Sequence, residues 1–74
     1  MGTPIEITPA RLVFEKVLRD HGGPGVDVHR EIVITEHSIS QVDDGKLISE
    51  LKFKPAERAR WIAACRSGGY SQKP

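Results

Sequence analysis

The spacing of hydrophobic residues in the first part of the chain predicts a helix. Thr8 and Pro9 suit a helix start, because a threonine side chain caps free backbone N–H groups and proline fits the first helical position. Gly22 and the Gly-Pro-Gly segment after it end the pattern. The sequence therefore predicts a helix over residues 8–21. One face of that helix, at spacings of three and four, consists of Ala10, Val13, Phe14, Val17 and Leu18.

A strand is predicted next, where hydrophobic and polar residues alternate with a period of two. Arg30 interrupts the apolar side of this segment, which indicates either a strand at a sheet edge or a nearby partner for the charge. The following residues, 36–42, are polar apart from Ile39 and Val42. The β-branched residues that share one side of residues 26–35 are Val26, Val28, Ile32 and Ile34.

The Asp-Asp-Gly segment at residues 43–45 predicts a turn, since Asp-Gly favours the two-residue turn of a β-hairpin. Residues 46–53 then alternate between hydrophobic and polar positions, which predicts a further strand. Leu47, Ile48 and Leu51 also fit one face of a helix, so a helix remains the alternative for this segment.

A second helix is predicted over residues 55–67, opened by Pro55 and ended by Gly68 and Gly69. Residues 68–74 are predicted to form a flexible tail. The predicted inner side of this helix consists of Ala56, Ala59, Ile62 and Ala63, with Trp61 and Cys65 beside it.

These elements predict an α+β fold in which two helices pack on a two- to three-stranded antiparallel sheet, in the order α-β-β-α. Ile5 and Ile7 alternate with polar residues and add an optional short N-terminal strand. The length of 74 residues fits a single small domain over residues 1–74. Its predicted core combines Val13, Phe14, Val17 and Leu18 with Val28, Ile32, Ile34, Leu51 and Ile62.

The composition excludes several classes of protein. No apolar run approaches the roughly 18 residues that span a bilayer, and no basic and apolar leader is evident, so we expect a cytoplasmic protein. The single cysteine excludes an internal disulfide and a four-cysteine zinc site. We also expect no cofactor, because the glycine-rich segment follows a predicted helix, whereas phosphate-binding loops precede one.

The charges are distributed unevenly along the chain. Residues 1–51 carry five basic and nine acidic residues, a net charge of −4, whereas residues 52–74 carry six basic and one acidic residue, a net charge of +5. Arg and Lys neutralise phosphates and aromatic faces stack on bases, yet Trp, Tyr and Arg also dominate protein interfaces. An ordinary solvated surface is the simpler interpretation. The candidate partner-binding residues are Lys52, Lys54, Arg58, Arg60, Trp61, Arg66 and Tyr70.

Catalytic and metal chemistry are not indicated. His29 and His37 would lie about 26 Å apart along one strand, too far to share a metal ion. The neighbouring Arg58 and Arg66 would favour a reactive thiolate at Cys65, but the sequence supplies no positioned base and orienting group for it.

We therefore expect a small non-enzymatic regulator, typical of phage- or plasmid-type accessory proteins. Its expected partner is a protein, such as a machine that handles nucleic acid in transcription, which it modulates or inhibits. Direct DNA or RNA binding through the basic C-terminal helix is the alternative. A helix-turn-helix and the interleaved aromatics of an RNA-binding sheet are both lacking, which favours the protein partner. A homodimer is a further option, since a thin core and open strand edges gain from being covered.

Overall fold

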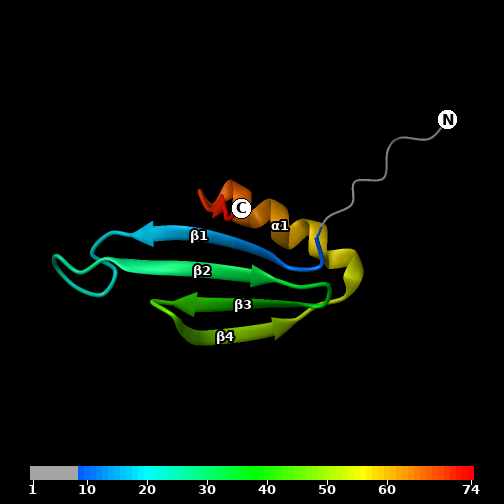
Figure 1. Ribbon diagram of the computed structural model, residues 1–74, viewed down its shortest axis with the longest axis horizontal. Coiled ribbons are helices and arrows are strands. Elements are labelled where there is room, and N and C mark those ends of the chain that lie inside the picture. The colour runs from blue at the N-terminus through cyan, green and yellow to red at the C-terminus, as the bar shows by residue number, and fades with distance from the viewer. Residues whose placement is uncertain (1–8) are drawn as a thin grey trace.

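The computed structural model describes residues 9–74 and shows one antiparallel sheet with one helix on it (Figure 1). The strand order across the five-stranded sheet is β4-β3-β2-β1-β5. A short 3-10 turn, η1, leads directly into the helix α1. The elements are β1 (Leu12–Leu18), β2 (Val28–Ile34), β3 (Ser38–Asp43), β4 (Lys46–Lys52), η1 (Pro55–Glu57), α1 (Arg58–Ser67) and β5 (Ser71–Gln72).

The predicted arrangement of two helices on a two- to three-stranded sheet is wrong, because the segment predicted as the first helix forms β1. Leu12, Phe14 and Leu18 share one side of a strand, so the hydrophobic pattern fits both periods. All seven residues of β1 pair with β2, and Leu12 and Phe14 enter the core from this strand, so contacts with distant segments override the local helical pattern. The predicted Thr8 cap and the optional strand at Ile5 and Ile7 lie outside the described residues.

The middle of the chain follows the sequence prediction more closely. The hairpin between β3 and β4 is confirmed, and φ values of 49° at Asp44 and 80° at Gly45 are those of the predicted two-residue turn. The strand alternative for residues 46–53 is also confirmed, since β4 occupies most of that segment. The polar segment before the turn forms β3, a strand that the sequence did not predict.

The core lies between α1 and the half of the sheet made by β1 and β2. Phe14 and Ile34 are both 0% exposed at its centre. The predicted core is confirmed for Phe14, Ile34 and Ile62, whereas Leu51 is 55% exposed. Ala59 and Ala63 are exposed, because α1 turns a different side to the sheet than predicted. The buried hydrophobic residues are Leu12, Phe14, Ile34, Phe53, Ile62 and Cys65.

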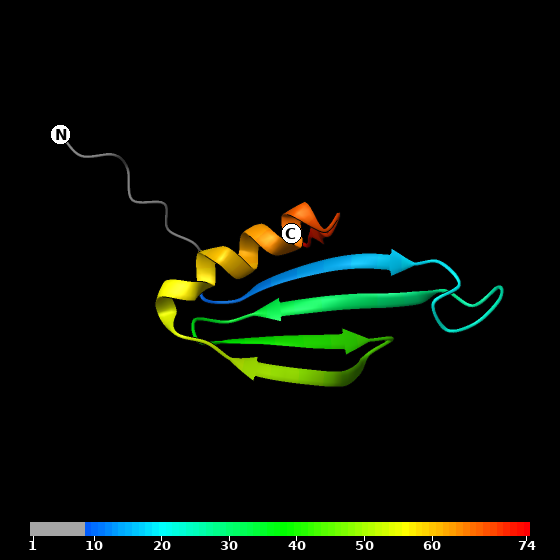
Figure 2. The same cartoon turned by 180° about the vertical axis from the view of Figure 1, so that it is seen from behind.

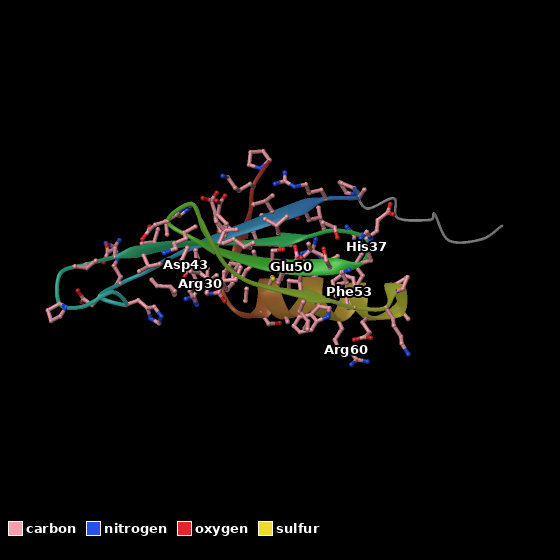
Figure 3. The ribbon with its side chains drawn as sticks, turned by 90° about the horizontal axis from the view of Figure 1, so that it is seen from below. Arg30, His37, Asp43, Glu50, Phe53 and Arg60 are labelled. Atoms are coloured by element: carbon pink, nitrogen blue, oxygen red, sulfur yellow. The ribbon has the colours of Figure 1, made fainter. Side chains whose placement is uncertain are left out.

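The helix covers only part of one face of the sheet. In Figure 2 it runs alongside β1, away from β3 and β4. Figure 3 shows the helix on one side of the sheet and no element of the described chain on the other. Val13 and Val17 of the predicted core lie on this second face, because they alternate with Leu12 and Phe14. The β3 and β4 half of the helix-bearing face is therefore left for other contacts.

Arg30 has a charge partner in the neighbouring strand, which decides between the two interpretations of its position. β2 is an inner strand, and the Arg30 guanidinium donates Nε to Asp43 Oδ1 at 2.8 Å and Nη2 to Asp43 Oδ2 at 3.0 Å. Gln41 Nε2 also donates to the same carboxylate at 3.3 Å. These hydrogen bonds, chiefly those of Arg30, hold the pKa of Asp43 below its usual value, although partial burial opposes the shift.

Replacing Asp43 with asparagine is expected to lower the free energy of unfolding by about 1–3 kcal/mol at pH 7. A pKa that is lower in the folded state stabilises the protein above the unfolded value of about 3.9, and this contribution is lost as the pH falls through the folded pKa. The difference between the parent and Asp43→Asn should therefore shrink at acidic pH. Urea denaturation at pH 7 and near pH 3 measures it. An equal difference at both pH values would show that the ionised carboxylate does not stabilise the fold.

Candidate protein-binding surface

The predicted partner-binding residues do not form one continuous patch, because α1 separates them. Trp61 lies on the side of the helix that faces β3 and β4, whereas exposed Arg60 points away from the sheet (Figure 3). Arg66 and Tyr70 lie on the other side, next to β5 and β1. Lys52 belongs to the opposite face of the sheet, since it alternates with Leu51.

Arg58 is engaged inside the fold. Its Nε donates to the Thr35 carbonyl oxygen at 2.9 Å, and its Nη2 donates to the Pro9 carbonyl oxygen at 2.5 Å. The side chain thereby ties the start of α1 to the segment after β2 and to the chain before β1. Arg58 was a candidate for contact with a partner, but the structure leaves it half-buried. A charge reversal at Arg58 would therefore disturb the fold as well as any binding.

The β5 side of the helix is closed by contacts within the chain. Arg66 Nη2 donates to Gln72 Oε1 at 3.5 Å, and half-buried Tyr70 packs against the core. Lys16 Nζ donates to the Gly68 carbonyl oxygen at 2.7 Å and lies 5.5 Å from the centre of the Tyr70 ring. The segment predicted as a tail thus contributes β5 and a core contact.

A groove of about 250 Å³ lies between α1 and the uncovered half of the sheet. Trp61 forms its helix side, and its ring stacks on Phe53 with 6.5 Å between ring centres and 24° between planes. This contact holds the indole in place beside the exposed Leu51. The groove is lined by Ile32, Ile39, Ser40, Gln41, Ser49, Leu51 and Trp61.

Lys54 and Arg60 are cations next in sequence to the stacked pair Phe53 and Trp61. Both residues are exposed, and neither side chain makes an ion pair or hydrogen bond with any residue in the described part of the chain. Figure 3 shows Arg60 projecting away from the sheet, and Phe53 between the end of β4 and the helix. Glu57, three residues after Lys54, accepts the Lys54 backbone N–H at 3.4 Å. An apolar groove with exposed cations near it in sequence suits an acidic segment that carries a hydrophobic side chain.

A second hollow, of about 380 Å³, brings together Glu15, His29 and Ser71. His29 Nε2 lies 2.9 Å from Glu15 Oε1, and Ser71 pairs with Glu15 in the sheet. The carboxylate therefore lies between the imidazole and the hydroxyl, because β1 runs between β2 and β5. A hydrolytic triad needs the imidazole in the middle, so this arrangement does not activate Ser71. No sequence pattern indicated this cluster, because its members lie far apart in the sequence and meet only through strand pairing.

The other chemistries that the sequence raised find little support. Cys65 is buried, and burial raises the pKa of its thiol, which is opposite to the activation expected from neighbouring arginines. No group of three or more metal-ligating side chains occurs within residues 9–74. His21, His29 and His37 accordingly share no metal site there.

Compared with known proteins, the chain matches no family model, no curated protein and no solved structure. Within residues 9–74, no helix has the length and hydropathy that a bilayer crossing requires.

Proposed function

We propose that this chain is a non-enzymatic protein-binding module, which takes a hydrophobic side chain of an acidic partner segment into the groove beside Trp61. The observation that carries this proposal is the groove itself, an exposed and largely apolar hollow, with the exposed cations Lys54 and Arg60 next in sequence to Phe53 and Trp61. Trp and Arg are frequent anchors of protein interfaces. Phe53 holds the indole in position before binding, which reduces the entropy lost on association.

The distribution of basic residues favours a protein partner over direct nucleic-acid binding. A nucleic-acid backbone is followed by a continuous positive groove. Here Arg58 is engaged by backbone carbonyl oxygens, Arg66 by Gln72, and Lys73 Nζ by Glu31 Oε2 at 2.8 Å. Lys54 and Arg60, next in sequence to Phe53 and Trp61, are exposed, and two such charges suit a few carboxylates better than a run of phosphates.

The proposed role is regulatory. By binding an acidic segment of a larger protein, such as a machine that handles nucleic acid, the module would modulate or inhibit that protein without changing it chemically. Capture from a lysate, with and without nuclease, identifies the partner. Purified partner is then titrated against the chain, and the emission of the only tryptophan, Trp61, reports on the groove.

Reversing the charges of Lys54 and Arg60 to glutamate should weaken binding of the purified partner by about tenfold to a hundredfold, because like charges would then face its acidic residues. The matched control reverses Arg11 and Lys46, which changes the net charge equally. Arg11 lies close enough to Glu31 to lower its pKa, and Glu31, which alternates with Ile32, is on the face away from the helix; Lys46 pairs with Asp43 beside the β3–β4 turn.

Equal binding by both double variants would remove Lys54 and Arg60 from the interface. Loss of capture after nuclease, with a log–log salt slope of about −0.7 to −0.9 per phosphate contacted, would instead assign the surface to nucleic acid.

A further inference from the structure

β4 ends the sheet on one side and leaves a free strand edge. All seven of its residues are exposed, and β3 is its only neighbour among the described strands. Unpaired backbone groups on such an edge bind a further strand readily, and proteins with open edges blunt or cover them. The groove lies on the helix-bearing face, so the backbone edge of β4 is a separate feature.

The hydrogen bonds to β3 define which residues of β4 present free backbone groups. The Phe53 N–H donates to the His37 carbonyl oxygen at 2.9 Å, so residues 53, 51 and 49 turn their backbone groups toward β3. Glu50 and Lys52 alternate with them and turn their N–H and C=O groups outward. A bulge between β3 and β4 interrupts this alternation on the N-terminal side of Ser49. The regular free edge is therefore limited to residues 49–53.

Few registers allow two such edges to pair around a two-fold axis. In an antiparallel ladder, residues whose free backbone groups point out of one edge must pair with residues of the same kind in the other copy. Within this segment, Glu50 and Lys52 of one copy can therefore pair only with Glu50 or Lys52 of the second copy. Two of these registers place Glu50 against Glu50 or Lys52 against Lys52, which is unfavourable. The third centres on Leu51 and places each Glu50 against a Lys52.

We propose that a second copy of this chain pairs with the free edge of β4, in the antiparallel register that centres on Leu51. Each Glu50 then exchanges backbone hydrogen bonds with Lys52 of the second copy, and their opposite charges meet on the open face of the sheet. The two Leu51 side chains meet on the helix-bearing face, where each is 55% exposed in the single chain. Charge complementarity within one strand thus identifies the occupant of the edge.

This pairing joins two sheets into one and removes both β4 edges. Leu51 also lines the groove, so the seam brings the grooves of the two copies to either side of the two-fold axis. A dimer would present two partner-binding grooves on one face, and two linked sites bind a bivalent partner more tightly than one. The dimer itself rests only on β4 and holds whether or not the groove binds the proposed partner.

Sedimentation of the purified protein tests the pairing directly. The parent is expected at twice the chain mass of 8.2 kDa. Glu50→Lys and Lys52→Glu each place two like-charge pairs in the seam, and each should weaken the dimer by about tenfold to a hundredfold. Lys46→Glu reverses a charge on the same strand outside the paired segment and should leave the dimer intact.

Charge exchange distinguishes this register from others. The double variant Glu50→Lys/Lys52→Glu should recover the dimer, and an equimolar mixture of the two single variants should form a heterodimer, because every lysine again meets a glutamate. A monomeric parent at high micromolar concentration would overturn the proposal. Single variants that remain dimeric, or a mixture that remains monomeric, would overturn the register. Lys54→Glu/Arg60→Glu should weaken partner binding while the protein still sediments with the mass of a dimer. The two proposals can therefore be contradicted independently of each other.

Discussion

Replacing Phe14 with alanine is expected to lower the free energy of unfolding by about 3–5 kcal/mol. The side chain is 0% exposed. Phe14 pairs with Ile32 of β2, and its ring packs in the core between the sheet and the helix. Its removal leaves a cavity that a small core cannot easily close. A loss of this size is a large part of the total stability of about 5–15 kcal/mol typical of native domains, so much of the variant should be unfolded at 37 °C.

Val17→Ala is the matched control for this change. Val17 lies on the other face of the sheet and is 48% exposed, so its truncation should cost less than about 1 kcal/mol. A helix over residues 8–21 would have placed Phe14 and Val17 on one face, whereas a strand places them on opposite faces. Denaturation in urea compares the two variants. Similar losses for both would contradict the assignment of this segment to β1.

Replacing Phe53 with alanine is expected to have an effect of similar size, about 3–5 kcal/mol. Phe53 follows β4, is only 9% exposed, and links β4 to the helix through its stacking on Trp61. The variant should therefore lose stability and also the fixed position of the indole. A shift of Trp61 emission to longer wavelength, measured in the folded variant at low temperature, would report the second effect.

Leu51→Ala provides the comparison for Phe53→Ala. Leu51 lies two residues earlier on the same side of the strand, but it is 55% exposed. Its truncation should therefore lower the free energy of unfolding by less than about 1 kcal/mol. Its truncation should change partner binding more than stability. An equal loss of stability in the two variants, or unchanged Trp61 emission in Phe53→Ala, would show that Phe53 does not support the groove.

The sequence predicted the elements whose patterns fit only one period or carry a specific turn signal. The alternation in residues 26–35 predicted β2, and the Asp-Gly turn predicted the hairpin. Pro55 and the glycines at 68 and 69 predicted where the C-terminal helix begins and ends. β1 was missed because its hydrophobic residues satisfy both the helical and the strand spacing. Pairing along the whole of β2, a contact between distant segments, decides between them, and a local pattern does not contain that information.

The candidate surface was predictable only in part, for a related reason. Counting charges located the basic segment and Trp61, but it did not separate Lys54 and Arg60 from the cations that the fold engages. Arg58 donates to Thr35, 23 residues away, and Lys73 to Glu31, 42 residues away. The groove likewise combines Trp61 with side chains of β3 and β4. Such contacts follow from the tertiary structure and leave no trace in residue spacing.

The central claim is that the groove beside Trp61 binds a protein, and site-specific photo-crosslinking tests it most directly. A photo-crosslinking amino acid replaces Arg60, next to Trp61, in one sample and Arg11 on the opposite face in the other. Both proteins are irradiated in lysate of the source cells after nuclease treatment. We predict a crosslinked protein from position 60 that is absent from position 11. A crosslink from position 11 alone, or a product from position 60 that forms only without nuclease, would contradict the account.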